Sequence, residues 1–108
     1  MGGKKYSAGL LRVLILSELA AGESYGYELA QRLRTRSNGS LSVKATNLYP
    51  ILHRLETDAL IESRWVAGDI VHPQKRYRLT QDGQRAAHAS VAEFAKLTSA
   101  MLLYLDRP

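Results

Sequence analysis

Side chains suited to nucleic acid gather in two short windows of the chain. Residues 44–54 contain Lys44, Thr46, Asn47, Tyr49, His53 and Arg54, and residues 72–78 contain His72, Lys75, Arg76 and Arg78. In protein–DNA complexes, asparagine pairs with adenine and arginine with guanine, while lysine, arginine and tyrosine hydroxyls bind phosphates. The two windows therefore predict a DNA-binding surface, the first reaching base edges and the second holding the backbone.

Two other patterns resemble catalytic or metal sites. Gly22–Gly26 reads Gly-Glu-Ser-Tyr-Gly, which matches the nucleophile elbow of large hydrolases. That motif needs a preceding strand and a large sheet, which 108 residues cannot supply, so we expect Ser24 to cap a helix. His53 and Glu56 lie one helical turn apart, but two ligands do not make a zinc site. The chain has no cysteine, and we expect no catalysis, metal or cofactor.

The charge of the chain is distributed unevenly. The 108 residues fit one domain and carry 15 basic and 10 acidic side chains, a net charge of +5. Residues 1–80 hold the whole excess, whereas residues 81–108 are balanced, so we expect a polyanion-binding part and a separate part with another role. No uninterrupted apolar run is long enough to span a bilayer, and no signal peptide is visible. We expect a cytoplasmic protein without membrane contact.

Apolar spacing predicts three helices over residues 7–20, 25–36 and 44–58. Apolar residues surround nearly the whole first helix, which must therefore be covered on more than one side, either by a second subunit or by other helices of this chain. Tyr27 is expected to be buried between helices. Pro50 interrupts the third helix, which must either begin near Asn47 or bend at the proline.

The period then changes. Residues 60–67 and 75–79 predict two strands of a hairpin, with Trp65 packed at its base, and Thr80 is expected to cap a last helix that extends to about Leu105. Apolar residues recur along that helix at alternating spacings of four and three, which suits packing on another helix. The predicted subunit interface comprises Leu10, Leu14, Val91, Phe94, Thr98, Met101 and Leu105.

Three helices, a hairpin and a further helix are the layout of a winged helix-turn-helix domain. The predicted fold class is mainly α with a small β-hairpin. Residues 1–80 form the DNA-binding domain, with the third helix in the major groove and the hairpin as its wing. Residues 81–108 form a C-terminal dimerisation helix. The alternative is a winged-helix ligand sensor or protein-interaction adaptor without DNA binding.

The chain resembles the PadR family of transcriptional regulators over roughly residues 8–85. The matching stretches are Gly26–Leu29, Leu48–Glu56, Leu60–Trp65 and Lys75–Thr80 with Gly83. Leu-Tyr-Pro is a hallmark of the recognition helix in this family, which accounts for Pro50. Members often carry Gly-Thr where this chain has Thr46-Asn47, and a tyrosine where it has Arg76. Both departures affect which operator is read rather than whether DNA is bound.

The resemblance implies a homodimer of the short branch of the family, joined by the last helix packing on the partner's first and last helices. Two-fold symmetry then places the recognition helices in successive major grooves, about 34 Å apart, on a pseudopalindromic duplex. It also implies a repressor that is released by a small aromatic or hydrophobic effector. The expected partners are double-stranded DNA, a second copy of the chain and this effector.

Overall fold

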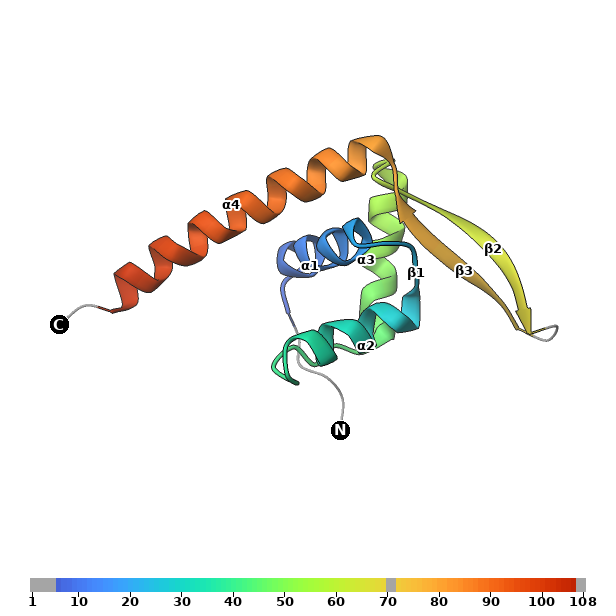
Figure 1. The fold of residues 1–108 in the computed structure, drawn as a ribbon, viewed down its shortest axis with the longest axis horizontal. Coiled ribbons are helices and arrows are strands. Elements are labelled where there is room, and N and C mark those ends of the chain that lie inside the picture. The colour runs from blue at the N-terminus through green and yellow to red at the C-terminus, as the bar shows by residue number, and fades with distance from the viewer. Residues whose placement is uncertain (1–5, 70–71, 107–108) are drawn as a thin grey trace.

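The computed structural model describes residues 6–69 and 72–106, with side chains described outside residues 68–73. Its elements follow one another as α1 (Ala8–Ala20), β1 (Ser24–Tyr25), α2 (Gly26–Arg36), α3 (Ala45–Thr57), β2 (Ile61–Asp69), β3 (His72–Leu79) and α4 (Gln81–Leu105). Figure 1 shows a helical body from which the β2–β3 hairpin and α4 extend in opposite directions. The predicted winged helix-turn-helix fold is confirmed.

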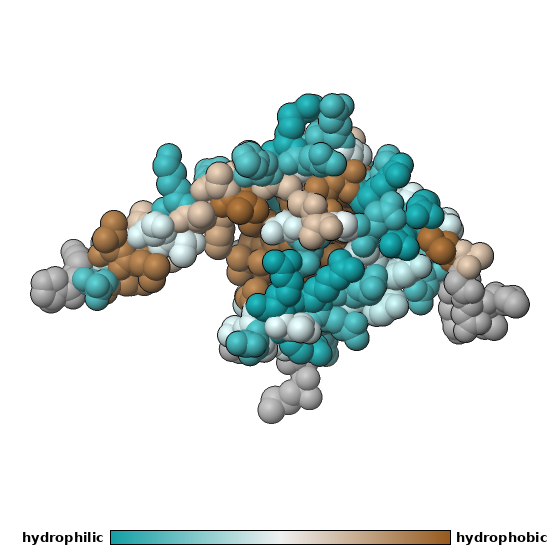
Figure 2. Space-filling view, viewed as in Figure 1, coloured by the Kyte–Doolittle hydropathy of each residue, from teal (hydrophilic) through white to brown (hydrophobic). Residues whose placement is uncertain are grey.

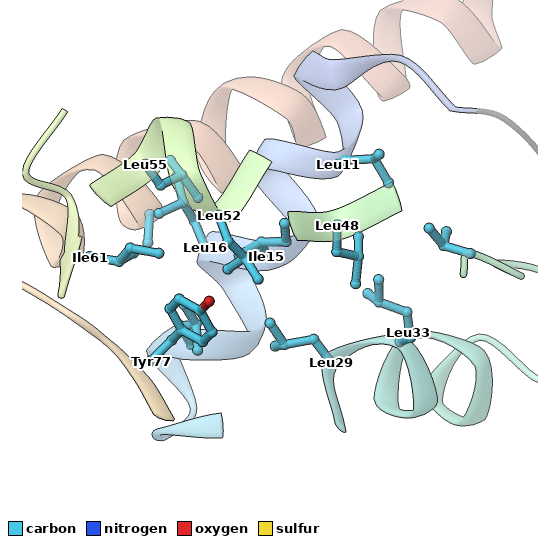
Figure 3. Packing of buried hydrophobic residues seen from close by; sticks show 14 residues of the cluster. Leu11, Ile15, Leu16, Leu29, Leu33, Leu48, Leu52, Leu55, Ile61 and Tyr77 are labelled. Atoms are coloured by element: carbon cyan, nitrogen blue, oxygen red, sulfur yellow. The ribbon is translucent and has the colours of Figure 1, made fainter. Parts of the chain in front are cut away.

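The core joins the three helices of the body to the base of the sheet. Leu48, Leu52 and Leu55 recur at spacings of four and three on one side of α3, and all three are fully buried. Figure 3 shows these side chains meeting leucines and isoleucine of α1 and α2, with Ile61 and Tyr77 closing the sheet end. Burial of each such leucine contributes about 1.5–3 kcal/mol relative to an exposed one, so α3 is anchored firmly through this side.

Helix α1 is covered by its own chain on one side. Leu11, Ile15, Leu16 and Leu19 are buried in the core, whereas Leu10, Val13 and Leu14 are only half-buried. Of the two explanations for its apolar circumference, cover within the chain therefore accounts for one side and leaves the other available.

A buried acidic residue interrupts this apolar helix. Glu18 is almost fully buried, and Oε1 of Glu18 accepts a hydrogen bond of 2.8 Å from Nη1 of Arg36 at the end of α2. A buried carboxylate is tolerated when it is paired in this way. Arg36, in the last turn of α2, thus links α2 to α1 through its ion pair with Glu18.

The sheet has three strands in the order β1-β3-β2, all antiparallel. The two-residue strand β1 was not predicted, because two residues are too short for a period-two pattern. Ser24 was expected to cap α2, and this prediction is wrong: Ser24 is buried in β1 and its hydroxyl donates to the Tyr25 carbonyl. The Tyr25 N–H instead donates to Oε1 of Glu28, at 2.9 Å.

Helix α3 begins at Ala45 and includes Pro50. Of the two alternatives for Pro50, a regular helix that begins near Asn47 is therefore excluded. Proline has no N–H, so the carbonyl of Thr46, four residues earlier, loses its helical partner. Because Thr46 and Pro50 are both exposed, solvent water can satisfy that carbonyl.

A backbone junction fixes where α4 starts. Ala59 adopts φ 59° and ends α3, and the Leu60 carbonyl accepts a hydrogen bond from the Thr80 N–H at 3.0 Å. The Thr80 hydroxyl accepts from the Gly83 N–H, which confirms the predicted cap. A Cβ on Gly83 would lie 1.8 Å from the Leu60 oxygen, so only glycine allows this approach. These contacts thus fix the start of α4 relative to the base of the wing.

In the part of the chain that the structure describes, none of the helices has the length and apolar character needed to cross a membrane.

Candidate nucleic-acid interface

The exposed side of α3 carries its polar side chains in three rows. Residues seven apart lie two helical turns apart on the same side, which pairs Asn47 with Arg54 and Thr46 with His53. Tyr49 is two residues from Asn47 and therefore lies almost opposite to it around the helix. The predicted contacts on α3 all lie outside the core and are all exposed: Lys44, Thr46, Asn47, Tyr49, His53 and Arg54. The structure therefore keeps these six accessible but spreads them over a broad surface.

The row that contains Arg54 borders the start of α1. Nε of Arg54 lies 3.5 Å from Oδ2 of Asp58, one turn further along, and both side chains are substantially exposed. A shallow 230 Å³ depression joins this row to Arg12 and the first residues of α1. An exposed pair of this kind contributes less than about 1 kcal/mol, so Arg54 can exchange Asp58 for another anion at small cost.

Tyr49 faces the wing across a cavity of 440 Å³, here called the aromatic slot. A Cβ on Gly26 would lie 2.7 Å from Cε1 of Tyr49, so the Tyr49 ring rests on the start of α2 because Gly26 has no side chain. The slot is lined by residues of β1, α2, α3, β2 and β3, namely Tyr25, Gly26, Tyr27, Tyr49, Trp65, Gln74, Lys75 and Tyr77.

Two expectations about the slot residues are wrong. Tyr27 was expected to be buried and is 46% exposed, and Trp65 was expected at the packed base of the wing and is 66% exposed. Tyr27 lies in the first turn of α2, and its ring stacks on that of Tyr25, with ring centroids 5.9 Å apart. Trp65 pairs with Lys75 in mid-hairpin, beyond the reach of the core. The expectation that Tyr49 is exposed is confirmed.

Lys75 lies on the face of the wing that looks toward α3. Its Nζ lies 5.6 Å from the centroid of the Trp65 ring and 3.7 Å from Oε1 of Glu56. Glu56 is also bound by Ser63, whose hydroxyl donates to Oε2 at 2.8 Å. Glu56 thus turns toward the wing rather than toward His53, and it holds Lys75 beside α3.

Tyr77 closes the inner end of the slot. Burial raises the pKa of Tyr77 above its ordinary value, and the negative charge of Glu56 and the neighbouring Tyr49 raise this pKa further. The Tyr77 hydroxyl, like that of an ordinary tyrosine, is protonated at neutral pH, and the raised pKa keeps it protonated to a higher pH.

The opposite face of the wing holds an arginine cluster around one carboxylate. Glu23, in the turn before β1, lies 3.1 Å from Arg64, 3.0 Å from Arg76 and 3.9 Å from Arg78. Arg78 also donates to Glu62 at 2.6 Å. Alternation along β3 places Arg76 and Arg78 away from Lys75, so the structure divides the predicted wing contacts between two faces. The local sequence around Glu23 does not predict this cluster, because its three arginines lie on β2 and β3, which follow much later in the sequence.

One predicted wing residue lies partly outside the described structure. The backbone of His72 begins β3 opposite Asp69, whereas its side chain is outside the described residues.

Helix α4 projects past the body and leaves its apolar residues uncovered. Gly83 and Ala87 pack on the body, and the same side of the helix continues through Phe94 and Met101, which are exposed. Figure 2 shows apolar surface at the free end of α4 and in the angle between α4 and the body. The predicted interface residues Val91, Phe94, Thr98, Met101 and Leu105 are all exposed, whereas Leu10 and Leu14 on α1 are half-buried.

Solved structures of similar proteins share this architecture. A PadR family transcriptional regulator from Eggerthella lenta is 32% identical, with a TM-score of 0.77 over 93% of this chain and 85% of that one. A transcriptional regulator from Clostridium thermocellum is 29% identical, with a TM-score of 0.78 over 92% of each chain. PadR from Bacillus subtilis, solved in complex with operator DNA, is 27% identical, with a TM-score of 0.70 over 76% of this chain and 46% of that one.

The sequence itself matches the model of the PadR-like family of transcriptional regulators over residues 15–89, from the middle of α1 to the third turn of α4. This range contains the whole of α3, the β2–β3 hairpin and the junction that starts α4. The chain therefore belongs to the PadR-like family of transcriptional regulators.

Proposed function

We propose that this protein binds double-stranded operator DNA as a homodimer and represses transcription from the site that it covers. The observation that carries the proposal is α3, which buries three leucines on one side and exposes a broad polar surface on the other, with Lys75 of the wing beside it. The complex of Bacillus subtilis PadR with operator DNA supports it by similarity. The DNA-facing part of the chain also carries the whole excess of positive charge.

The three rows of α3 divide the contacts. Thr46 and His53 lie in the middle row and face the base edges, and Asn47 and Arg54 read bases or phosphates along one wall of the groove. Tyr49, on the other side, donates its hydroxyl to a phosphate, and Lys44 and Lys75 neutralise phosphates at the two ends of the surface. Arg76 and Arg78 reach phosphates only by giving up part of their contact with Glu23 and Glu62, and His72 contacts the backbone near the tip of the wing.

The exposed side of α4 supports the dimer. Its apolar residues overhang the body and continue the seam that already packs on α1, and the half-buried Leu10 and Leu14 extend this apolar surface. A two-fold axis through this seam presents two copies of α3 to one side, and the matching DNA is a pseudopalindrome with half-sites about 34 Å apart.

A cavity beside the seam supports release by a small hydrophobic or aromatic effector. This cavity of 400 Å³ lies between α1 and α4 and is lined by Ser17, Ala20, Gln84, Ala87, His88 and Val91. Its volume is in the range of small-molecule sites. An apolar molecule bound there would shift α4 on α1 and change the distance between the two recognition helices.

The test is binding to duplexes from the region upstream of its own gene, measured by fluorescence anisotropy over a series of salt concentrations. We expect affinity to fall steeply with salt, and Arg54→Ala and Lys75→Ala each to flatten the slope of log K against log salt by about one unit. Arg85→Ala, on the neutral part of the chain, is the control and leaves the slope unchanged. An intact dimer that shows no salt-dependent binding to any of these duplexes would overturn the proposal in favour of a ligand sensor or adaptor.

A further inference from the structure

Exposed large apolar side chains occur in only two places in the described residues. On α4 they run from Val91 to Leu105, and everywhere else they number three: Tyr27, Tyr49 and Trp65. All three line the aromatic slot, although they come from α2, α3 and β2. Exposed apolar surface that is concentrated in one place marks a binding site.

The chemistry of the slot differs from that of an apolar docking groove. Its walls are aromatic, but tyrosine hydroxyls and the Lys75 ammonium reach its surface, and polar and apolar atoms are mixed. Tyrosine and lysine donate hydrogen bonds, and the raised pKa of Tyr77 keeps its hydroxyl protonated to a higher pH than that of an ordinary tyrosine. The slot thus offers flat apolar faces together with donors and a cation; Glu56 pairs with Lys75 but is not among the lining residues.

The slot also lies between α3 and the wing, where one strand of a bound duplex would pass. It is bounded on one side by Tyr49 of α3 and on the other by Trp65 and Lys75 of the wing. A duplex that receives α3 in one groove and the wing in the next must pass one sugar-phosphate backbone between them. A deoxyribose has apolar C–H faces and a phosphate is a strong acceptor, which is the combination that the slot accommodates.

We propose that the aromatic slot binds one sugar-phosphate backbone of the operator, and that Tyr27 and Trp65 contact this DNA. The phosphate accepts hydrogen bonds from the Tyr27 and Tyr49 hydroxyls and pairs with Lys75, while the deoxyribose packs on the Trp65 ring. Gly26 is a positioning residue, because it lets the Tyr49 ring rest on the start of α2. The inference rests on the proposed function and adds two residues that sequence reasoning placed elsewhere, Tyr27 between helices and Trp65 at the packed base of the wing.

The contact is independent of base sequence, so a labelled duplex from the upstream region and a scrambled duplex of the same length are both used as probes. We expect Tyr27→Phe to weaken binding to both duplexes roughly tenfold, because it removes one hydrogen bond to a charged group. It should leave the salt slope unchanged, whereas Lys75→Gln flattens the slope by about one unit. Ser99→Ala, on the exposed side of α4 almost opposite Met101, also removes one hydroxyl away from the slot and should have no effect.

Two further measurements address the same contact. Trp65 is the single tryptophan of the chain, so its emission should change when either duplex saturates the protein. A duplex with one neutral methylphosphonate at the seated phosphate should bind wild type more weakly, and Lys75→Gln should be insensitive to that substitution. Gly26→Ala, which displaces the Tyr49 ring without removing a polar group, should weaken binding several-fold while the protein remains folded by circular dichroism.

The inference is overturned if Tyr27→Phe and Trp65→Leu bind both duplexes like wild type while Arg54→Ala binds them more weakly. That result would leave the proposed function standing. Unchanged Trp65 emission at saturating duplex would also overturn the inference. If wild type binds neither duplex in a salt-dependent way, the proposed function fails, and the inference fails with it.

Discussion

The two exposed apolar regions of this protein, the overhang of α4 and the aromatic slot, differ in composition. The overhang is made mainly of aliphatic side chains, with Phe94 and Tyr104 among them, on a helix with balanced charge, whereas the slot is lined mainly by tyrosines, with one tryptophan and a lysine, in the basic part of the chain. Aliphatic surface gains only from exclusion of water, which suits another apolar surface. Aromatic rings with polar atoms suit a partner that is partly charged. The composition of an exposed patch therefore indicates the class of its partner.

The largest expected effect comes from a charge on the overhang. Phe94→Asp should weaken the dimer by about 2–4 kcal/mol, because it places an unpaired carboxylate in the centre of the seam. This corresponds to a roughly 30- to 1000-fold higher dissociation constant, measurable by sedimentation equilibrium. Ala92→Asp puts the same charge nearly opposite Phe94 around the helix and should leave the dimer intact. A persistent Phe94→Asp dimer would show that this part of α4 is not the interface.

Gly83→Ala should break the junction that connects the two regions. The added Cβ would lie 1.8 Å from the Leu60 carbonyl oxygen, which is backbone and cannot move aside without shifting α4 or the start of β2. We expect a loss of more than about 2 kcal/mol in the free energy of unfolding, measured by urea denaturation. Gln84→Ala, an exposed position one residue later, should change stability by less than about 0.5 kcal/mol. Equal stability of the two variants would contradict the close approach.

Ala59→Gly should strengthen the same junction. Ala59 ends α3 in the left-handed region at φ 59°, and the Leu60 N–H closes the helix on the Leu55 carbonyl at 2.9 Å. Glycine avoids the strain of a Cβ in this conformation, but it loses more backbone entropy on folding. We expect a net gain of about 0.5–1 kcal/mol in urea denaturation, with dimer and DNA affinities unchanged. Ala67→Gly, in strand β2, should show no gain.

The smallest expected effect concerns the slot at alkaline pH. Because the folded state raises the pKa of Tyr77, folding favours its protonated form, and this contribution is fully present below the unfolded pKa of about 10. It is lost as pH rises through the higher folded value. Wild type should therefore lose more stability than Tyr77→Phe between about pH 8 and about pH 11. Equal losses in thermal unfolding would show that Tyr77 does not contribute.

Much of the fold followed from local patterns. The four helices, the hairpin, the Thr80 cap and the class of the fold could be predicted because apolar periodicity and capping residues act within a few turns. Ser24, Tyr27 and Trp65 were misplaced, because the burial of each depends on which other elements lie beside it. Ser24 pairs with Tyr77 in a two-residue strand, and Trp65 sits in mid-hairpin, where the core no longer covers it.

The sequence by itself determined which side of α3 faces away from the core and where the charge lies, since both are properties of single elements. Only the tertiary structure decided which of them meet. The approach of Tyr49 to Gly26 brings α3 against the start of α2, and the pairing of Lys75 with Glu56 brings the wing beside them. The same packing gathers three arginines around Glu23 on the other face of the wing. Such convergence depends on packing between distant segments, and no local period encodes it.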